Sequence, residues 1–193
     1  VWLFIVLELV SIPTYIMVAT GRSQIIAQEA GIKYFFLGAL AAAIFLFGFS
    51  YIYGATGASG FADVREALGG SELAALQNPL ALIGSLAVIV GVSFKIAAVP
   101  FHFWCPDVFE GANLDVSDFL SVASKGAGLV LLLRLLMILV HALPPSGVMN
   151  MMAIVLGIIA AATITVGNTG ALVQTNIKRL LAYSSIAQAG YML

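Results

Sequence analysis

The sequence predicts an all-α fold, a polytopic transmembrane bundle of about six helices that includes one discontinuous helix. Of its 193 residues, 62% are hydrophobic and only 9% are charged, and the mean hydropathy is +1.09. A soluble domain carries about 25% charged residues, so this chain could not cover its surface in water. Backbone groups in lipid must be hydrogen-bonded internally, and alternating strand patterns are absent from the sequence, which leaves helices.

Six apolar segments can be drawn along the chain, and a bilayer core of about 30 Å needs about 20 helical residues to cross it. The segments are residues 1–20, 33–53, 78–99, 116–143, 148–172 and the shorter 180–193. Both ends of the chain lie within apolar runs. We therefore expect residues 1–193 to form a single membrane domain, the central part of a longer protein.

The connections between these segments contain turn and interfacial signals. Residues 54–60, with three glycines, predict a flexible turn, and they lack the Gly-Lys-Ser/Thr ending of a phosphate-binding loop. Residues 62–76 carry several charges and predict a short interfacial helix. Residues 144–147, Pro-Pro-Ser-Gly, predict a tight stop between two helices.

Composition also excludes several classes of partner. The formal net charge of −1 argues against nucleic acid and against a polybasic membrane anchor. Cys105 is the single cysteine, so no internal disulfide can form. His102 lies three residues before Cys105, but two such ligands beside prolines rarely make a zinc site. We expect no metal and no cofactor in this chain, and no signal peptide, since the first residues include no basic region.

The distribution of basic residues predicts the orientation in the membrane. The second and fourth connections hold only Arg65 and the nearby His141. Four basic residues lie in the first, third and fifth connections: Arg22, Lys33, Lys178 and Arg179. Because positive residues favour the cytoplasmic side, we expect the odd-numbered connections to lie there.

Glu8, Lys95 and Lys125 lie deep inside apolar segments, whereas Arg134 falls toward the end of its segment and is interpreted as an anchor whose head reaches the membrane surface. Glu8 stands about 21 Å before Arg22 along a helix, and Lys125 about 10 Å after Asp118. A lysine at this depth costs roughly 3 kcal/mol or more, and such residues usually serve ion or proton movement. The sequence therefore predicts a proton path through Glu8, Lys95 and Lys125. The alternative is a set of buried ion pairs that only fix helix packing.

A glutamate and a lysine on adjacent helices would form a switch. Burial disfavours the ammonium form of a lysine, whereas a nearby carboxylate stabilises it, so small helix shifts would make the lysine bind or release a proton. Pro100 follows Lys95 closely and predicts a break in the helix just after the lysine, a feature of ion sites in transporters. The alternative is an ordinary helix end followed by an aromatic belt of Phe101, Phe103 and Trp104.

Three stretches carry a resemblance to a known family. They are FKIAAVPFHFWCPDVFEGA at 94–112, FLSVASK at 119–125 and QTNIKRLLAYSSI at 174–186. In them the chain resembles the antiporter-like membrane subunits of respiratory complex I, most closely the N-type. The resemblance implies a fold of fourteen helices with two inverted five-helix repeats, of which this chain runs from the fifth helix into the tenth.

The resemblance also implies roles and partners. Glu8 would match the family's fifth-helix glutamate, Lys95 the lysine of the first broken helix and Lys125 the central lysine of the next helix. The function implied is a proton-translocating subunit of an NADH:quinone oxidoreductase in the bacterial inner membrane, whose redox centres lie in partner subunits. Its partners would be other membrane subunits, lipid and protons, with quinone reached only through the whole complex. The alternatives are a subunit of a multi-subunit Mrp-type cation/proton antiporter and a structural membrane scaffold.

Overall fold

The helical fold that the sequence predicts is confirmed by a computed structural model, which describes residues 2–21, 25–68, 79–142 and 147–193. Five of its helices are long and apolar enough to cross a membrane. The elements are α1 (Trp2–Thr20), α2 (Ile25–Thr56), α3 (Phe61–Leu68), α5 (Pro79–Ile96), α6 (Trp104–Gly111), α7 (Leu114–Phe119), the π-helical turn η1 (Leu120–Ser124), α8 (Lys125–Ala142), α9 (Gly147–Leu172) and α10 (Ile177–Met192).

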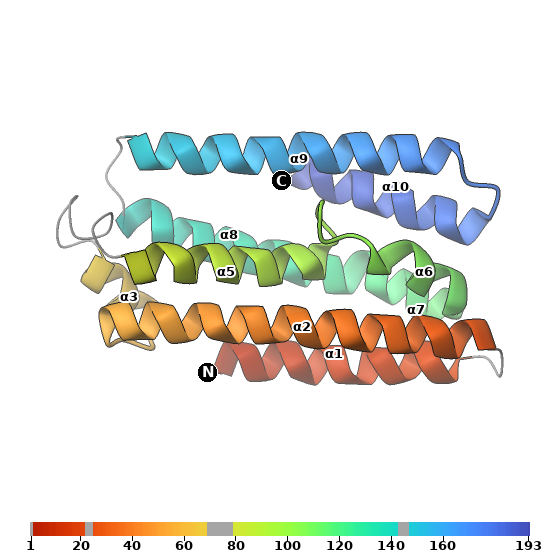
Figure 1. Cartoon of the computed structure of the whole chain (residues 1–193), viewed down its shortest axis with the longest axis horizontal. Helices are drawn as coiled ribbons and strands as arrows, with labels where there is room; N and C mark the ends of the chain where they lie inside the picture. The colour runs from red at the N-terminus through yellow and green to blue at the C-terminus, as the bar shows by residue number, and fades with distance from the viewer. Residues whose placement is uncertain (1, 22–24, 69–78, 143–146) are drawn as a thin grey trace.

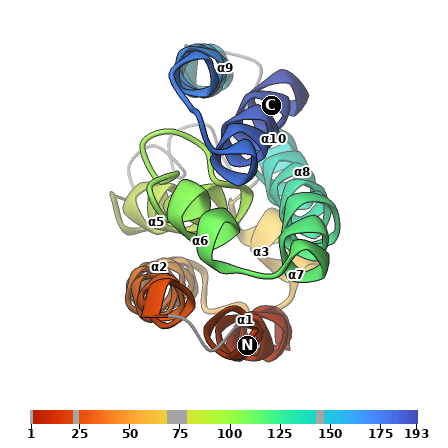
Figure 2. The ribbon, with the colours of Figure 1, turned by 90° about the vertical axis from the view of Figure 1, so that its right-hand side faces the viewer.

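The helices lie in three layers, which the end-on view of Figure 2 separates. Helices α1 and α2 form one outer layer, and α9 and α10 form the other. Between them lie α5, α6 and the continuous run of α7, η1 and α8 (Figure 1). The middle layer therefore contacts both outer layers, and it carries both lysines of the predicted proton path.

Small residues let the layers approach closely. A Cβ atom at Gly48 of α2 would lie 2.8 Å from the carbonyl oxygen of Gly84 on α5, and one at Gly84 would lie 2.8 Å from that of Gly48. Lipid gives no hydrophobic driving force for helix association, so membrane helices depend on close packing of this kind at small residues. Any side chain at Gly48 or Gly84 would push α2 away from α5.

Both ends of α2 differ from those predicted. Helix α2 begins at Ile25 rather than at residue 33, since Glu29 and Lys33 form an i,i+4 ion pair of 2.7 Å along the same helix. It also continues through Gly54 to Thr56, so the turn predicted at 54–60 is wrong for its first part and begins at Gly57, whose φ is 67°. The interfacial helix appears as α3 over Phe61–Leu68, whereas 69–76 and the stop at 144–146 lie outside the described residues.

The helix that carries Lys95 is discontinuous. Helix α5 ends at Ile96, and Ala97 follows with a φ of 57°, a left-handed conformation that a residue with a Cβ rarely adopts. The freed backbone groups find side-chain partners: Val99 N–H donates to Thr163 Oγ1 of α9 at 3.0 Å, and the Trp104 indole donates to the Phe94 carbonyl at 2.9 Å. These bonds satisfy the backbone at membrane depth, where water cannot do so.

The orientation of the bundle stays a prediction and can be tested by labelling. The C-terminal end of α1 and the N-terminal end of α10 lie at one end of the bundle, and α3 lies at the other (Figure 1). A cysteine introduced at the exposed Thr175 should react with an impermeant maleimide from the cytoplasmic side, and one at the exposed Ser59 from the opposite side. Native Cys105 is buried and should add little background. The reverse pattern would refute the basic-residue argument.

Candidate proton-transfer site

Lys95 is held at the end of α5 by a hydroxyl of α1. Its ammonium Nζ donates to Ser11 Oγ at 2.9 Å, across 84 residues of sequence. Ser11 Oγ in turn donates to the carbonyl of Leu7 at 2.7 Å, one turn earlier on α1. Because the hydroxyl proton is engaged by that carbonyl, the oxygen lone pairs of Ser11 are free to accept from the lysine.

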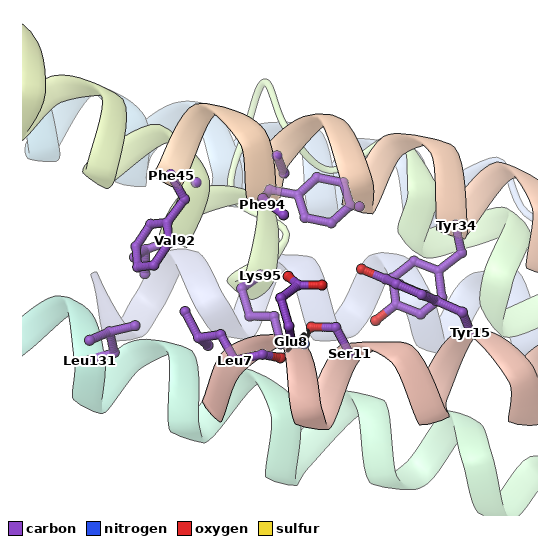
Figure 3. Close-up of a pocket in the computed structure, with 14 residues that line it drawn as sticks. Leu7, Glu8, Ser11, Tyr15, Tyr34, Phe45, Val92, Phe94, Lys95 and Leu131 are labelled. Carbon is purple, nitrogen blue, oxygen red and sulfur yellow. Dashed lines mark hydrogen bonds between the residues drawn. The ribbon is translucent and has the colours of Figure 1, made fainter. Parts of the chain in front are cut away.

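Glu8 and Lys95 line the same cavity, so they are near neighbours, as a coupled pair must be. Figure 3 shows their side chains, with that of Ser11, converging from α1 and α5, and the hydroxyls of Tyr15 and Tyr34 pointing into the same space. The cavity has a volume of about 30 Å³, which is enough for roughly two water molecules. Its lining residues are Leu7, Glu8, Ser11, Tyr15, Tyr34, Gly38, Ala41, Ala42, Phe45, Gly91, Val92, Phe94, Lys95 and Leu131.

The Glu8 carboxylate and the Lys95 ammonium do not form a direct ion pair. Among the described residues, the pairs closer than 4.0 Å do not include Glu8 with Lys95. Ser11 lies three residues after Glu8 and accepts from Lys95. A proton moving between the two would therefore pass through water or a hydroxyl, or would need a shift of one helix against the other.

Helix α8 connects the cavity with the second lysine. A Cβ atom at Gly128 would lie 3.5 Å from Cγ of Lys95 and 2.7 Å from Cγ2 of Ile96, so the lysine stem lies against α8 at this glycine. Leu131, one turn further on, lines the cavity. Lys125 lies one turn before Gly128 on the same helix.

Lys125 is buried in the middle layer, with only 2% of its surface exposed. Its ammonium donates to Ser185 Oγ of α10 at 2.7 Å and approaches Sγ of Cys105 on α6 at 3.7 Å. It also lies 5.8 Å from the centre of the Phe109 ring. The residue follows directly on the π-helical turn η1, and such turns often occur at functional sites.

A second charged cluster lies where α2, α6 and α10 meet. Arg179 pairs with Asp107 at 2.9 Å and with Glu110 at 2.7 Å, and Lys33 pairs with Asp107 at 3.0 Å. These side chains are about one-third to one-half exposed, so the cluster is partly solvated. It connects α6 to α2 and α10, and we interpret it as structural.

This interpretation predicts a loss of stability. Arg179→Gln should lower the free energy of unfolding by about 1 kcal/mol, because two partly exposed carboxylates lose their shared partner. Arg65→Gln, at an exposed arginine on α3, is the matched control. Thermal unfolding of the detergent-purified protein measures both, and equal midpoints for the two variants would show that the cluster contributes no stability.

Sequence reasoning identified the three charged residues but not their hydroxyl partners. The structure brings Glu8 and Lys95 together in one cavity, whereas Lys125 lies outside that lining and contacts Ser185 and Cys105. Cys105 thus lies beside a lysine. Among the described residues, no three His, Cys, Asp or Glu side chains cluster closely enough to hold a metal ion. No sequence signal marks Ser11 or Ser185, since serines are common in apolar helices.

All 193 residues match the family described as "NADH:quinone oxidoreductase/Mrp antiporter, TM". The chain belongs to this family. A relative in Bacillus anthracis, "NADH-quinone oxidoreductase subunit N", is 43% identical over 100% of this chain and 39% of its own length. A second, "NADH-quinone oxidoreductase subunit N 2" of Symbiobacterium thermophilum, is 45% identical over 99% of this chain and 38% of its own. The chain thus spans about two-fifths of the length of these relatives.

Solved structures agree with this assignment. A chain of respiratory complex I from Thermus thermophilus is 39% identical with a TM-score of 0.77, covering 97% of this chain and 38% of that one. The Mrp complex of a Dietzia species gives a TM-score of 0.82 over 98% of this chain and 34% of that one, but at 23% identity, which shows a shared fold alone. The resemblance to complex I subunits is confirmed, and the Mrp alternative is less supported. The bacterial relatives and the five apolar helices make this a multi-pass protein of the bacterial inner membrane.

Proposed function

We propose that this chain is the central part of a proton-translocating membrane subunit of an NADH:quinone oxidoreductase. The single observation that carries the proposal is the burial of Lys125 at 2% exposure without an ion-pair partner within 4.0 Å among the described residues. A permanently charged, unpaired ammonium is costly at this depth, whereas one that gains and loses a proton serves as a relay. The relatives named as subunit N support the oxidoreductase assignment.

Glu8 and Lys95 form one proton-transfer site, and Lys125 forms the other. Lys95 and Lys125 each hold a proton on Nζ and release it when their surroundings change. Glu8 stabilises the protonated form of Lys95 from across the cavity that both residues line. A helix shift that separates Glu8 from Lys95 would favour release, and one that brings them together would favour uptake.

The redox chemistry belongs to partner subunits. A single cysteine gives this chain no ligand set for an iron–sulfur cluster. The proposed partners are other membrane subunits of the complex and the lipid bilayer, and quinone is reached only through the whole assembly. Residues 1–193 act as one membrane domain of the whole subunit. The energy for proton movement reaches the lysines as a conformational or electrostatic change in their neighbours.

The proposal can be tested in membranes of a strain that lacks the whole gene. We expect NADH-driven acidification of inverted vesicles to disappear and to return when the gene is supplied again. The Mrp-type alternative predicts instead that NADH-driven acidification persists while sodium-dependent proton exchange is lost. The scaffold alternative predicts that variants of Glu8, Lys95 and Lys125 that assemble also translocate protons normally.

A further inference from the structure

Ser185 of α10 provides the closest contact to the Lys125 ammonium, at 2.7 Å. Lys95 has a carboxylate in its cavity, but the described contacts of the Lys125 ammonium are a hydroxyl, a thiol and an aromatic ring. The hydroxyl comes from α10, and the thiol and the ring come from α6, so none of the three lies on the helix that carries Lys125. The groups that hold Lys125 in place are therefore different from the carboxylate that acts on Lys95.

The hydroxyl of Ser185 is oriented to accept. Its proton is donated to the carbonyl oxygen of Ala182 at 2.7 Å, one turn earlier on α10. A serine hydroxyl carries one donor and two lone pairs, so with the proton engaged by Ala182 the lone pairs remain for Lys125. The arrangement leaves a lone pair for the donor at Lys125 Nζ, and the other side-chain contact of this hydroxyl among the described residues is with Cys105, whose Sγ lies 3.9 Å away.

The other two contacts are weaker acceptors. A thiol sulfur is a poor acceptor, and Cys105 Sγ lies 3.7 Å from the ammonium. The face of Phe109 lies 5.8 Å away, near the outer limit for attraction between a cation and a ring. A hydrogen bond from a charged donor to an oxygen is among the stronger interactions in a protein interior, and Ser185 makes the shortest one here.

We propose that Ser185 is a positioning residue that holds the Lys125 ammonium in the middle layer through its hydroxyl oxygen. The proposal rests on the proposed function, in which Lys125 carries a proton. Ser185 does not itself carry the proton, because its own hydroxyl proton is engaged in a hydrogen bond to the Ala182 carbonyl. Its effect is to keep the ammonium at a fixed place between α6, α8 and α10 until the proton leaves.

The same arrangement occurs at Lys95, which supports the interpretation. There too a serine of another helix accepts from the ammonium, at 2.9 Å, and donates its own proton to a backbone carbonyl of its preceding turn, at 2.7 Å. Ser11 and Ser185 belong to the two opposite outer layers of the bundle (Figure 2). Each outer layer thus supplies one hydroxyl to one lysine of the middle layer.

The test uses the whole protein in its assembled complex, with NADH-driven proton translocation measured in membrane vesicles. Ser185→Ala should slow translocation on the order of tenfold, because the ammonium loses its only close oxygen acceptor among the described residues. Ser185→Thr and Ser185→Val have nearly the same shape and differ in the hydroxyl, so threonine should retain most of the rate and valine should not. Ser184→Ala, at the exposed neighbouring serine, is the matched control and should behave as the wild type.

The outcomes separate this proposal from the function on which it rests. A normal rate in Ser185→Ala, or an equal loss in the threonine and valine variants, would overturn the positioning role. A loss in Ser184→Ala as large as that in Ser185→Ala would overturn it as well. If Lys125→Ala translocates normally in the same vesicles, the proposed function fails; if it does not but Ser185→Ala does, only the role of Ser185 fails.

Discussion

Replacing Lys125 by arginine should slow NADH-driven proton translocation by roughly tenfold or more, although the positive charge is kept. A lysine can release its proton when burial disfavours the ammonium, whereas a guanidinium stays protonated at any accessible pH. Arginine is also larger, and the Lys125 side chain is buried against Ser185, Cys105 and Phe109. The charge would therefore be present at the right depth but unable to move a proton.

The ranking of two variants distinguishes a relay from a structural charge. The relay predicts that Lys125→Arg is impaired and that Lys125→Ala is impaired more. A structural role predicts the opposite ranking, with arginine tolerated and alanine destabilising the complex. Translocation is measured in vesicles, together with the amount of assembled complex in each membrane preparation, so that a loss of assembly is not mistaken for a loss of transport.

Replacing Glu8 by glutamine should also lower translocation by roughly tenfold, because Lys95 then loses the charge that favours its protonated form. Glutamine keeps the size of the side chain and its hydrogen-bonding capacity, so the cavity shared with Ser11 and Lys95 should remain. Glu8→Asp keeps the carboxylate on a shorter stem and should retain more activity than Glu8→Gln. The expected order is wild type, then aspartate, then glutamine.

The control for this series is Glu66→Gln, at an exposed carboxylate of α3 that does not line the cavity. It removes the same charge from the protein without touching the cavity, and it should translocate protons as the wild type does. Equal rates in the wild type, Glu8→Asp and Glu8→Gln, with the complex assembled, would show that this carboxylate has no part in transport.

Much of this arrangement could be predicted from the sequence. The charges at Glu8, Lys95 and Lys125 could be recognised because each lies well inside a long apolar run, where burying a charge is costly. The end of α5 at Ile96 follows from the proline four residues later. The helical conformation of the apolar segments was predictable as well, because only helices satisfy the backbone hydrogen bonds of such segments in lipid.

The remaining features depend on contacts between distant parts of the chain. Lys95 and Ser11 are 84 residues apart, and Lys125 and Ser185 are 60 apart, so no local pattern indicates that they meet. The π-helical turn before Lys125 has no composition of its own. The glycines at 54–60 predicted a turn, but Gly54 lies within α2, since the apolar helix continues past it.

The central claim is that a buried lysine moves protons in this protein, and proton translocation by the Lys125→Ala variant tests it most directly. The measurement is the initial rate of NADH-driven acidification of vesicles, normalised to the amount of assembled complex. We expect a rate roughly tenfold or more below that of the wild type. A wild-type rate from the assembled alanine variant would contradict it.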